Sequence, residues 1–424
     1  MTKPLLRILV STWLVGIASV TPADDWPQWG GPNRDFQIAG PELADWSDDA
    51  PAERWRRTLG EGYAGIAVVG DLLVTQARDG DTEAVVAFDA TTGAPRWRVE
   101  HPAPKADFSD RHGYGPHTTP AMHDGRVVAV GSDGSVHAID AAEGRRAWRV
   151  DLWAAEDATR HGVGYANSPL IVDGAVLLPV GGEGGALVAL DLDDGSTRWR
   201  SGSFKNGFAS PIRLDMSGRA AVALFAAQSV QAFDAETGTL HWRIDHPNPN
   251  GANITTPLVV RDEQAVHGLF LSSGPEKGSR LLRMVDGSAH EAWTTSRFRV
   301  FYTNALVLGH RIVGSTGGVG TAMLAAVDVA TGEIAWRDRR IGRANLVQVG
   351  RSTLALDDEG TLWHLRIADD EVQIVGETQL FDGRSWTGPT VVGSRLYARD
   401  REALVAIDLP KVGERAARQA AASR

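Results

Sequence analysis

The 424-residue sequence contains no cysteine. This absence excludes disulfides, thiolate metal ligands, cysteine nucleophiles and the thioether by which lipoproteins are anchored. Excess positive charge is also lacking, because 43 Lys and Arg are set against 53 Asp and Glu, for a formal charge of −10. An acidic chain is a poor partner for nucleic acid, whose phosphates need clustered cations. Beyond the N-terminus, no apolar run approaches the roughly 20 residues of a membrane-spanning helix.

The N-terminal residues 1–23 have the parts of a secretory signal peptide. Lys3 and Arg7 supply positive charge, a mostly apolar run extends from Ile8 to Val20, and small residues lead to cleavage near Ala23. An N-terminal membrane anchor is the alternative, although the run contains Ser and Thr and is short for a span. We therefore expect a periplasmic or secreted protein without a lipid anchor. Cleavage would remove two cations and change the formal charge from −10 to −12.

A motif of the form Ala-x-Asp-x-x-Thr-Gly-x-x-x-Trp recurs along the chain, with Glu or Asp replacing Thr in some copies. Apolar residues that alternate before the Asp predict a β-strand, and the Asp and Gly predict a tight turn. The Trp supplies a large ring that can fill the gap between neighbouring sheets. Copies begin at Ala87, Ala138, Ala189, Ala232 and Ala326, with a weaker one at Met284.

Two further strands are predicted between successive motifs, which gives four antiparallel strands in each repeat of 40 to 50 residues. The third strand of the repeat can be recognised eight times, and this number predicts an all-β fold, an eight-bladed β-propeller. A seven-bladed ring is the alternative, because the repeat at 343–375 is the most degenerate. The eight third strands are centred on Phe88, Ile139, Leu190, Phe233, Val285, Val327, Leu365 and Ile407.

The two ends of the repeat array complement each other. The strand around Trp55 has no blade before it, and the strand ending at Asp408 has no Trp strand after it. Pairing of these two strands would close the ring and remove its open edge. We therefore predict an opening segment over 24–52, a propeller over 53–410 and a flexible tail over 411–424.

The repeat resembles that of the pyrroloquinoline quinone (PQQ)-like propeller family from Trp55 to Asp408, and the stretch from Asp25 to Arg34 is similar to the opening of exported single-domain members. One branch of this family contains quinoprotein alcohol and sugar dehydrogenases, which hold PQQ and a divalent cation over the channel. Another contains scaffold propellers such as the BamB-type component of outer-membrane protein assembly. The lack of cysteine departs from both, since many of the dehydrogenases carry a vicinal disulfide and BamB-type proteins are usually lipid-anchored.

A candidate ligand site lies at one mouth of the central channel, where the first strand of each blade begins. Alignment of the repeats on a Ser/Thr-Pro step brings aromatic, amide and charged side chains to this mouth. Such groups could hold a planar carboxylated molecule or a peptide terminus, with His117 available for proton exchange. A channel filled only by water is the alternative. The candidate residues are Tyr63, His117, Tyr165, Asn167, Phe208, Asn253, Tyr302, Asn304, Arg343 and Trp386.

Two other patterns near this mouth are weaker. Asp110, His112 and His117 share one loop, but their spacing fits no known ligand pattern, so no metal site is predicted. Arginines also precede several blades and could hold a carboxylate or phosphate if they converge; the alternative is that they are simply solvated. These arginines are Arg111, Arg160, Arg299, Arg343 and Arg384.

No catalytic residues are predicted, because the chain lacks a Gly-x-Ser-x-Gly elbow, a phosphate-binding loop and a His-Glu-x-x-His motif. We predict a monomeric, non-catalytic binding or scaffold protein that engages other envelope proteins or a small ligand, without a cofactor. The alternative is a short quinoprotein dehydrogenase that stacks PQQ at the channel mouth and holds Ca²⁺ with Asn or Asp side chains.

Overall fold

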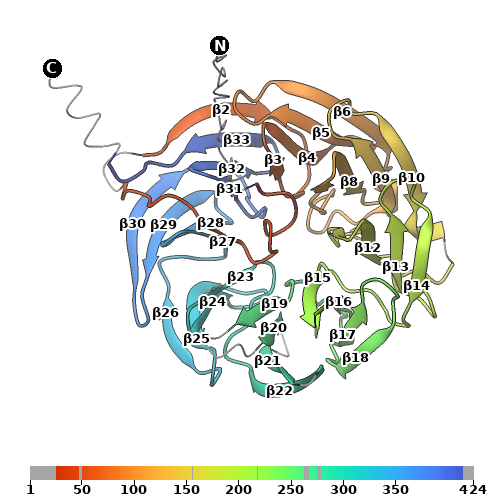
Figure 1. Ribbon diagram of the computed structural model, residues 1–424. Coiled ribbons are helices and arrows are strands. Elements are labelled where there is room, and N and C mark those ends of the chain that lie inside the picture. The colour runs from red at the N-terminus through yellow and green to blue at the C-terminus, as the bar shows by residue number, and fades with distance from the viewer. Residues whose placement is uncertain are drawn as a thin grey trace, which may run out of the picture.

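The computed structural model describes residues 25–46, 50–154, 156–216, 218–261, 267–274, 278–285 and 287–413. They form eight sheets that surround a central axis as blades of four antiparallel strands, and in one sheet β1 (Gln37–Ile38) adds a fifth, parallel strand (Figure 1). The predicted eight-bladed propeller is confirmed, and the seven-bladed alternative is wrong. The predicted signal peptide and the tail beyond residue 413 lie outside the described residues.

The blades follow one another in chain order. Blade 1 contains β3 (Ala67–Val69), β4 (Leu72–Asp79), β5 (Thr82–Asp89) and β6 (Pro95–Pro102); blade 2 contains β7 (Ala121–His123), β8 (Arg126–Val130), β9 (Ser135–Asp140) and β10 (Arg146–Asp151). Blade 3 contains β11 (Leu170–Val172), β12 (Ala175–Pro179), β13 (Leu187–Asp191) and β14 (Thr197–Ser201); blade 4 contains β15 (Ile212–Met216), β16 (Arg219–Phe225), β17 (Ser229–Asp234) and β18 (Leu240–Asp245). Blade 5 contains β19 (Leu258–Arg261), β20 (His267–Ser273), β21 (Gly278–Val285) and β22 (Ser288–Thr295); blade 6 contains β23 (Ala305–Leu308), β24 (Arg311–Thr316), β25 (Met323–Asp328) and β26 (Ile334–Asp338). Blade 7 contains β27 (Ala344–Val349), β28 (Ser352–Asp357), β29 (Thr361–Ile367) and β30 (Val372–Gln379); blade 8 contains β31 (Thr390–Val392), β32 (Arg395–Arg399), β33 (Ala403–Asp408) and β2 (Ala52–Thr58).

The N-terminal strand of the ring closes it, as predicted. Strand β2 pairs antiparallel with β33, and Trp55 lies opposite Ala406 in this ladder. Blade 8 therefore takes its outer strand from the beginning of the chain and its other three strands from the end. This pairing leaves no gap between the first and the last blade, so the ring has no open edge there.

The repeated motif joins each blade to its neighbour. In the first copy, the carboxylate of Asp89 accepts hydrogen bonds from the backbone N–H groups of Thr91 and Thr92, at 3.1 and 2.9 Å. The turn ends at Gly93 with a φ of +68°, and a Cβ there would lie 2.6 Å from the ring of Trp55 on the neighbouring blade. Glycine is thus required both by the turn and by the packed ring. The same contact recurs between Trp97 and Gly144, Trp148 and Gly195, Trp199 and Gly238, and Trp293 and Gly332.

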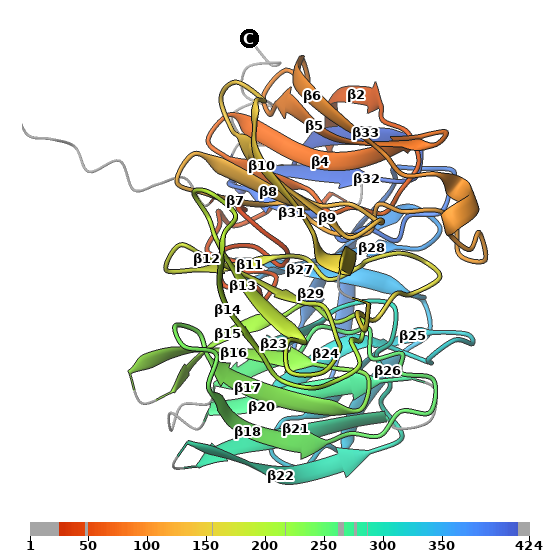
Figure 2. The same cartoon turned by 90° about the vertical axis from the view of Figure 1, so that its right-hand side faces the viewer.

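The opening segment crosses one end of the channel. The backbone of Trp26 exchanges two hydrogen bonds of 2.8 Å with Val68 of blade 1, while Gln37 donates to the carbonyl of Val307 in blade 6 at 3.2 Å. Strand β1 (Gln37–Ile38) then pairs parallel with β27 of blade 7. In Figure 1 this red segment crosses the centre of the ring, and in Figure 2 it lies on the opposite side from the loop that holds the short 3-10 helix η1 (Lys105–Asp107).

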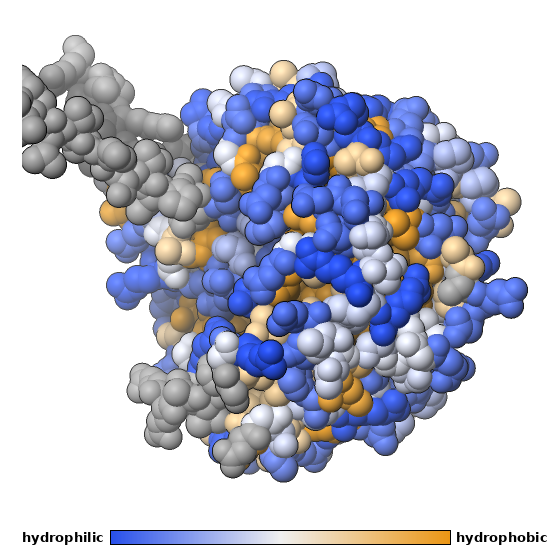
Figure 3. Space-filling view, turned by 45° about the vertical axis from the view of Figure 1, so that its right-hand side comes forward, coloured by the Kyte–Doolittle hydropathy of each residue, from blue (hydrophilic) through white to orange (hydrophobic). Residues whose placement is uncertain are grey.

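The outer surface is largely polar. Figure 3 shows a face on which hydrophilic side chains dominate and apolar ones form small, separate patches. The large hydrophobic side chains exposed on the described part of the chain are scattered at Leu240, Val285, Val319 and Val412. Within the described residues, no helix has the length and apolarity to cross a membrane.

Candidate functional site

The channel mouth opposite the opening segment contains a cavity of about 330 Å³, which we call the cup. Its wall comes from the loops that lead into the first strands of the blades. Trp29 of the opening segment also lines it, and the segment closes the channel beneath it. The cup is lined by Trp29, Tyr63, His112, His117, Val163, Ala166, Ser168, Phe208, Ser210, Ala252, Ile254, Thr256, Phe301, Tyr302, Trp386 and Thr387.

Hydroxyl groups of the Ser/Thr-Pro steps connect neighbouring blades along one side of the cup. The backbone N–H of Thr119 donates to the Ser168 hydroxyl at 2.9 Å, and the N–H of Ser168 donates to the Ser210 hydroxyl at 2.9 Å. The series continues from the N–H of Ser210 to the Thr256 hydroxyl at 3.3 Å, and the indole N–H of Trp29 reaches the same hydroxyl at 3.1 Å. The repeated step therefore holds the channel wall and anchors Trp29 against it.

A row of aromatic rings forms the other side of the cup. The ring of Tyr63 stacks on His117 on one side, with centroids 5.8 Å apart, and on Trp386 on the other, at 5.3 Å. Trp386 in turn stacks on Tyr302 at 6.1 Å and an interplanar angle of 7°. The hydroxyl of Tyr63 donates to the backbone carbonyl of His112 at 2.8 Å, which fixes the row to the loop above it. Four blades thus contribute to one preorganised wall.

Burial shifts the pKa values of two members of this row. Burial raises the pKa of Tyr63, while the positive charges of Arg401 and Arg384 partly oppose that shift. Burial lowers the pKa of His117, against the hydrogen bond that its Nε2 makes with the carbonyl of Val163 at 3.0 Å. The lowered pKa favours the neutral form of His117, whose ring is engaged with the backbone.

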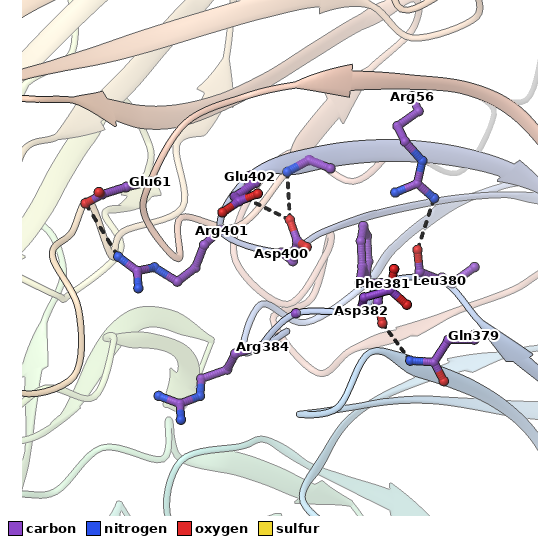
Figure 4. Close-up of a pocket in the computed structure, with 12 residues that line it drawn as sticks. Arg56, Glu61, Gln379, Leu380, Phe381, Asp382, Arg384, Asp400, Arg401 and Glu402 are labelled. Carbon is purple, nitrogen blue, oxygen red and sulfur yellow. Dashed lines mark hydrogen bonds and ion pairs between the residues drawn. The ribbon is translucent and has the colours of Figure 1, made fainter.

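Three arginines lie over the aromatic row at the rim. The guanidinium carbons of Arg343, Arg384 and Arg401 lie 5.5, 4.6 and 5.7 Å from the rings of Tyr302, Trp386 and Tyr63, respectively. Arg343 is paired with Asp358 at 3.1 Å and Arg401 with Glu61 at 3.5 Å. Arg384 has no ion pair with any described residue. Figure 4 shows this difference in a polar cleft of about 1040 Å³ beside the cup, where Arg401 reaches Glu61 and Arg384 meets none of the other residues drawn.

The predicted site residues divide into two groups. Tyr63, His117, Phe208, Tyr302 and Trp386 line the cup, and Arg343 lies at its rim.

The other four predicted residues do not line the cup. Tyr165 donates to the carbonyl of Pro179 at 2.9 Å, and the amides of Asn167, Asn253 and Asn304 each donate to a backbone carbonyl at 2.7 Å. All four are buried within the channel wall. Tyr165 and Asn167 flank Ala166, which does line the cup, and neighbouring side chains of an extended chain point in opposite directions. The structure therefore places Tyr165 and Asn167 one position away from a residue that lines the cup, and it buries Asn253 and Asn304 in the wall as well.

Trp29 and Phe301 line the cup without having been predicted to do so. Trp29 lies outside the repeats, so the periodicity that located the other rings carries no signal for it. His112 was considered only as a metal ligand, yet it lies 6.4 Å from the ring of Trp386 and also lines the cup. For Trp29, the aromatic residues of the opening segment were the one sequence signal that could have pointed to the cup.

The cup does not fit PQQ with calcium. Calcium takes oxygen ligands, usually carboxylates and amide or backbone carbonyls. The described residues that line the cup include neither a carboxylate nor a carboxamide, and the asparagines expected to serve are bonded to the backbone elsewhere. Among the described parts of the chain, no three His, Asp or Glu side chains gather in a way that could hold a metal ion.

Two curated proteins show how far the sequence similarity extends. Outer membrane protein assembly factor BamB of Shewanella oneidensis is 23% identical over 299 residues, which are 67% of this chain and 72% of that protein. Quinohemoprotein alcohol dehydrogenase ADH-IIG of Pseudomonas putida is 32% identical over 131 residues, but these are 28% of this chain and 17% of that enzyme.

Solved structures share the fold at low identity. BamB from Moraxella catarrhalis has a TM-score of 0.59 at 18% identity, with 85% of this chain and 98% of that chain covered. The quinohemoprotein alcohol dehydrogenase from Comamonas testosteroni has a TM-score of 0.67 at 14% identity, with 93% and 82% covered. A family model described as outer membrane protein assembly factor BamB matches residues 46–214, 172–375 and 226–420. Since these overlapping matches extend over the whole ring, the chain belongs to this PQQ-repeat, BamB-like family of propellers.

Proposed function

We propose that this protein is an exported, non-catalytic binding protein of the cell envelope, and that the cup is its binding site. The observation that carries the proposal is the opening segment, which closes one end of the channel and leaves the cup open at the other. Ligand pockets are typically concave, mostly apolar and equipped with a few placed polar groups. The cup matches this description, with aromatic rings on one side and hydroxyl groups on the other.

The arrangement of the cup favours binding over catalysis. The ring of His117 is held by the carbonyl of Val163, and no Ser or Thr hydroxyl of the lining is hydrogen-bonded to a histidine. An activated nucleophile needs such a neighbouring base. The envelope location rests on the signal-peptide pattern and on the BamB-like family, and it makes other envelope proteins or a small ligand the expected partners.

Native mass spectrometry tests the proposal. The full-length chain would be expressed with its N-terminal residues and purified from the envelope fraction of its own host. We expect a bound species that is lost in Trp386→Ala, which removes the centre of the aromatic row. Trp336→Ala is the matched control, because Trp336 is a half-buried indole on the outer strand β26. A bound species retained by a folded Trp386→Ala protein would place the site outside the cup.

A second candidate is a short quinoprotein dehydrogenase. It is favoured by the 32% identity to a quinohemoprotein alcohol dehydrogenase over 28% of this chain, whereas the structural likeness to such an enzyme at 14% identity shows the fold alone. The lining of the cup argues against it, as described above. Dye-linked oxidation of alcohols or sugars after incubation with PQQ and Ca²⁺ distinguishes the two candidates, since turnover would replace the binding role with an enzymatic one.

A further inference from the structure

A buried cation lies directly behind the wall of the cup. Arg34 is 3% exposed, and its guanidinium donates to the carbonyls of Ser168 and Pro169 at 3.2 and 2.9 Å and to the Gln28 side chain at 3.0 Å. No described carboxylate lies within ion-pair distance of it. Burial lowers the pKa of Arg34 to about 9, so the side chain remains charged at neutral pH. Ser168, whose carbonyl holds this charge, lines the cup.

A second buried cation lies on the other side of the cup. Arg399 is fully buried and donates to the backbone carbonyls of Gly60, Gly62 and Gln76 at 3.2, 3.0 and 2.6 Å. It also has no carboxylate partner within ion-pair distance among the described residues. Burial lowers the pKa of Arg399 to about 9, so it too is charged at neutral pH. Gly62 directly precedes Tyr63, which places this charge behind the aromatic row.

These two arginines differ from the ordinary buried cation. Arg78, which is equally buried, forms an ion pair with the buried carboxylate of Glu83. Pairing of this kind is the rule, because an uncompensated charge away from water is costly. The exceptions, Arg34 and Arg399, both hydrogen-bond to the backbone of the cup's surroundings. In a poorly polarisable interior their charges act over longer distances than they would in water.

The cup itself supplies nothing to neutralise them. The described residues that line it carry no carboxylate, and Arg384 at the rim forms no ion pair with any described residue. Glu61 and Asp358 at the rim are already paired with other cations. The described lining of the cup therefore carries no negative charge of its own, and the adjoining polar cleft holds the carboxylates of Asp382, Asp400 and Glu402.

We infer that the cup binds an apolar organic anion: a small carboxylate whose aromatic or aliphatic body lies against the ring row and Trp29. The inference rests on the proposed role of the cup as a binding site and names the class of ligand. The carboxylate completes the charge balance left open by Arg34, Arg399 and Arg384. The hydroxyls of Ser168 and Ser210 accept backbone N–H groups, which leaves their hydrogens for donation to that carboxylate.

Calorimetric titration of the full-length protein tests this charge preference. The probes are naphthalene-2-carboxylate and the uncharged naphthalene-2-carboxamide, which have the same ring system and nearly the same shape. We expect the carboxylate to bind at least tenfold more tightly. Equal affinities would overturn the inference while leaving a binding cup in place, and binding of neither probe would overturn it as well. The broader proposal, that the cup is a binding site, is tested separately by native mass spectrometry, which looks for a bound species in the native protein.

Arginine variants assign the preference to particular charges. Arg384→Met should reduce the ratio of the two affinities severalfold, whereas Arg337→Met, an exposed arginine on β26, should leave it unchanged. The preference that remains in Arg384→Met should persist in about 0.5 M NaCl, because buried charges are screened less than exposed ones. Complete loss of this remaining carboxylate preference in salt would show that Arg34 and Arg399 contribute nothing, and would overturn their role. The salt titration avoids variants of these buried arginines, which would endanger the fold.

Discussion

Replacing Gly195 with alanine is expected to destabilise the propeller by about 2–5 kcal/mol, as the sum of two costs. Gly195 has a φ of +76°, and an added Cβ would lie 2.7 Å from the ring of Trp148. The left-handed conformation costs a residue with a Cβ roughly 1–2 kcal/mol, and forcing a methyl group into a packed contact costs roughly 1–3 kcal/mol more. Trp148 cannot move away freely, because it is 9% exposed and its indole N–H donates to the carbonyl of Leu192 at 2.9 Å.

Gly125→Ala is the matched control for the packing cost. Gly125 has a φ of +72°, but an added Cβ would meet nothing within 4 Å, so only the conformational cost of about 1–2 kcal/mol should apply. Urea denaturation followed by far-ultraviolet circular dichroism measures both variants. In a Trp148→Ala background, which itself should cost about 3–5 kcal/mol, Gly195→Ala should cost no more than Gly125→Ala. Equal losses for the two glycine variants in the otherwise unchanged protein would refute the packing explanation of the motif.

Three further predictions concern the ring, its pH dependence and the cup. Removing residues 402–424 deletes β33, which separates β2 from β32; the whole ring should lose its cooperative thermal transition, and an unchanged Tm would contradict ring closure as a source of stability. Burial lowers the pKa of His364 from its ordinary 6.5 to about 4, so this group contributes its full stability above pH 6.5 and loses up to about 3 kcal/mol as the pH falls to 4. Denaturation midpoints of His364→Gln should therefore vary less over this pH range than those of the unchanged protein, and an identical slope would argue against the buried neutral ring. Trp29→Ala should weaken binding of naphthalene-2-carboxylate at least tenfold in calorimetry, and full affinity would show that Trp29 does not contribute to the site.

The repeat in the sequence was enough to predict the propeller, because each feature that defines it joins residues that are close in sequence or one repeat apart. Asp89 bonds to residues two and three positions ahead, and the same turn recurs wherever the motif does. The contact between Trp148 and Gly195 joins residues one repeat apart, so the spacing of the motif reports it directly. Ring closure followed from counting strands, since one unpaired strand at each end leaves a single way to complete a blade.

The chemistry of the cup depended on the tertiary structure. Periodicity located the channel mouth, but one position decides whether a side chain faces the cavity, as Ala166 does, or is buried in the wall, as Asn167 is. Trp29 and Arg34 reach the channel only because the opening segment folds across it, and no repeat predicts that path. Arg399 donates to backbone carbonyls, including that of its sequence neighbour Asp400 at 3.1 Å, and forms no ion pair with a described carboxylate, which only the tertiary structure shows. Strand pairing and turns are encoded by neighbours along the chain, while the direction and charge balance of buried side chains are set by segments that are distant in sequence and meet only in the folded ring.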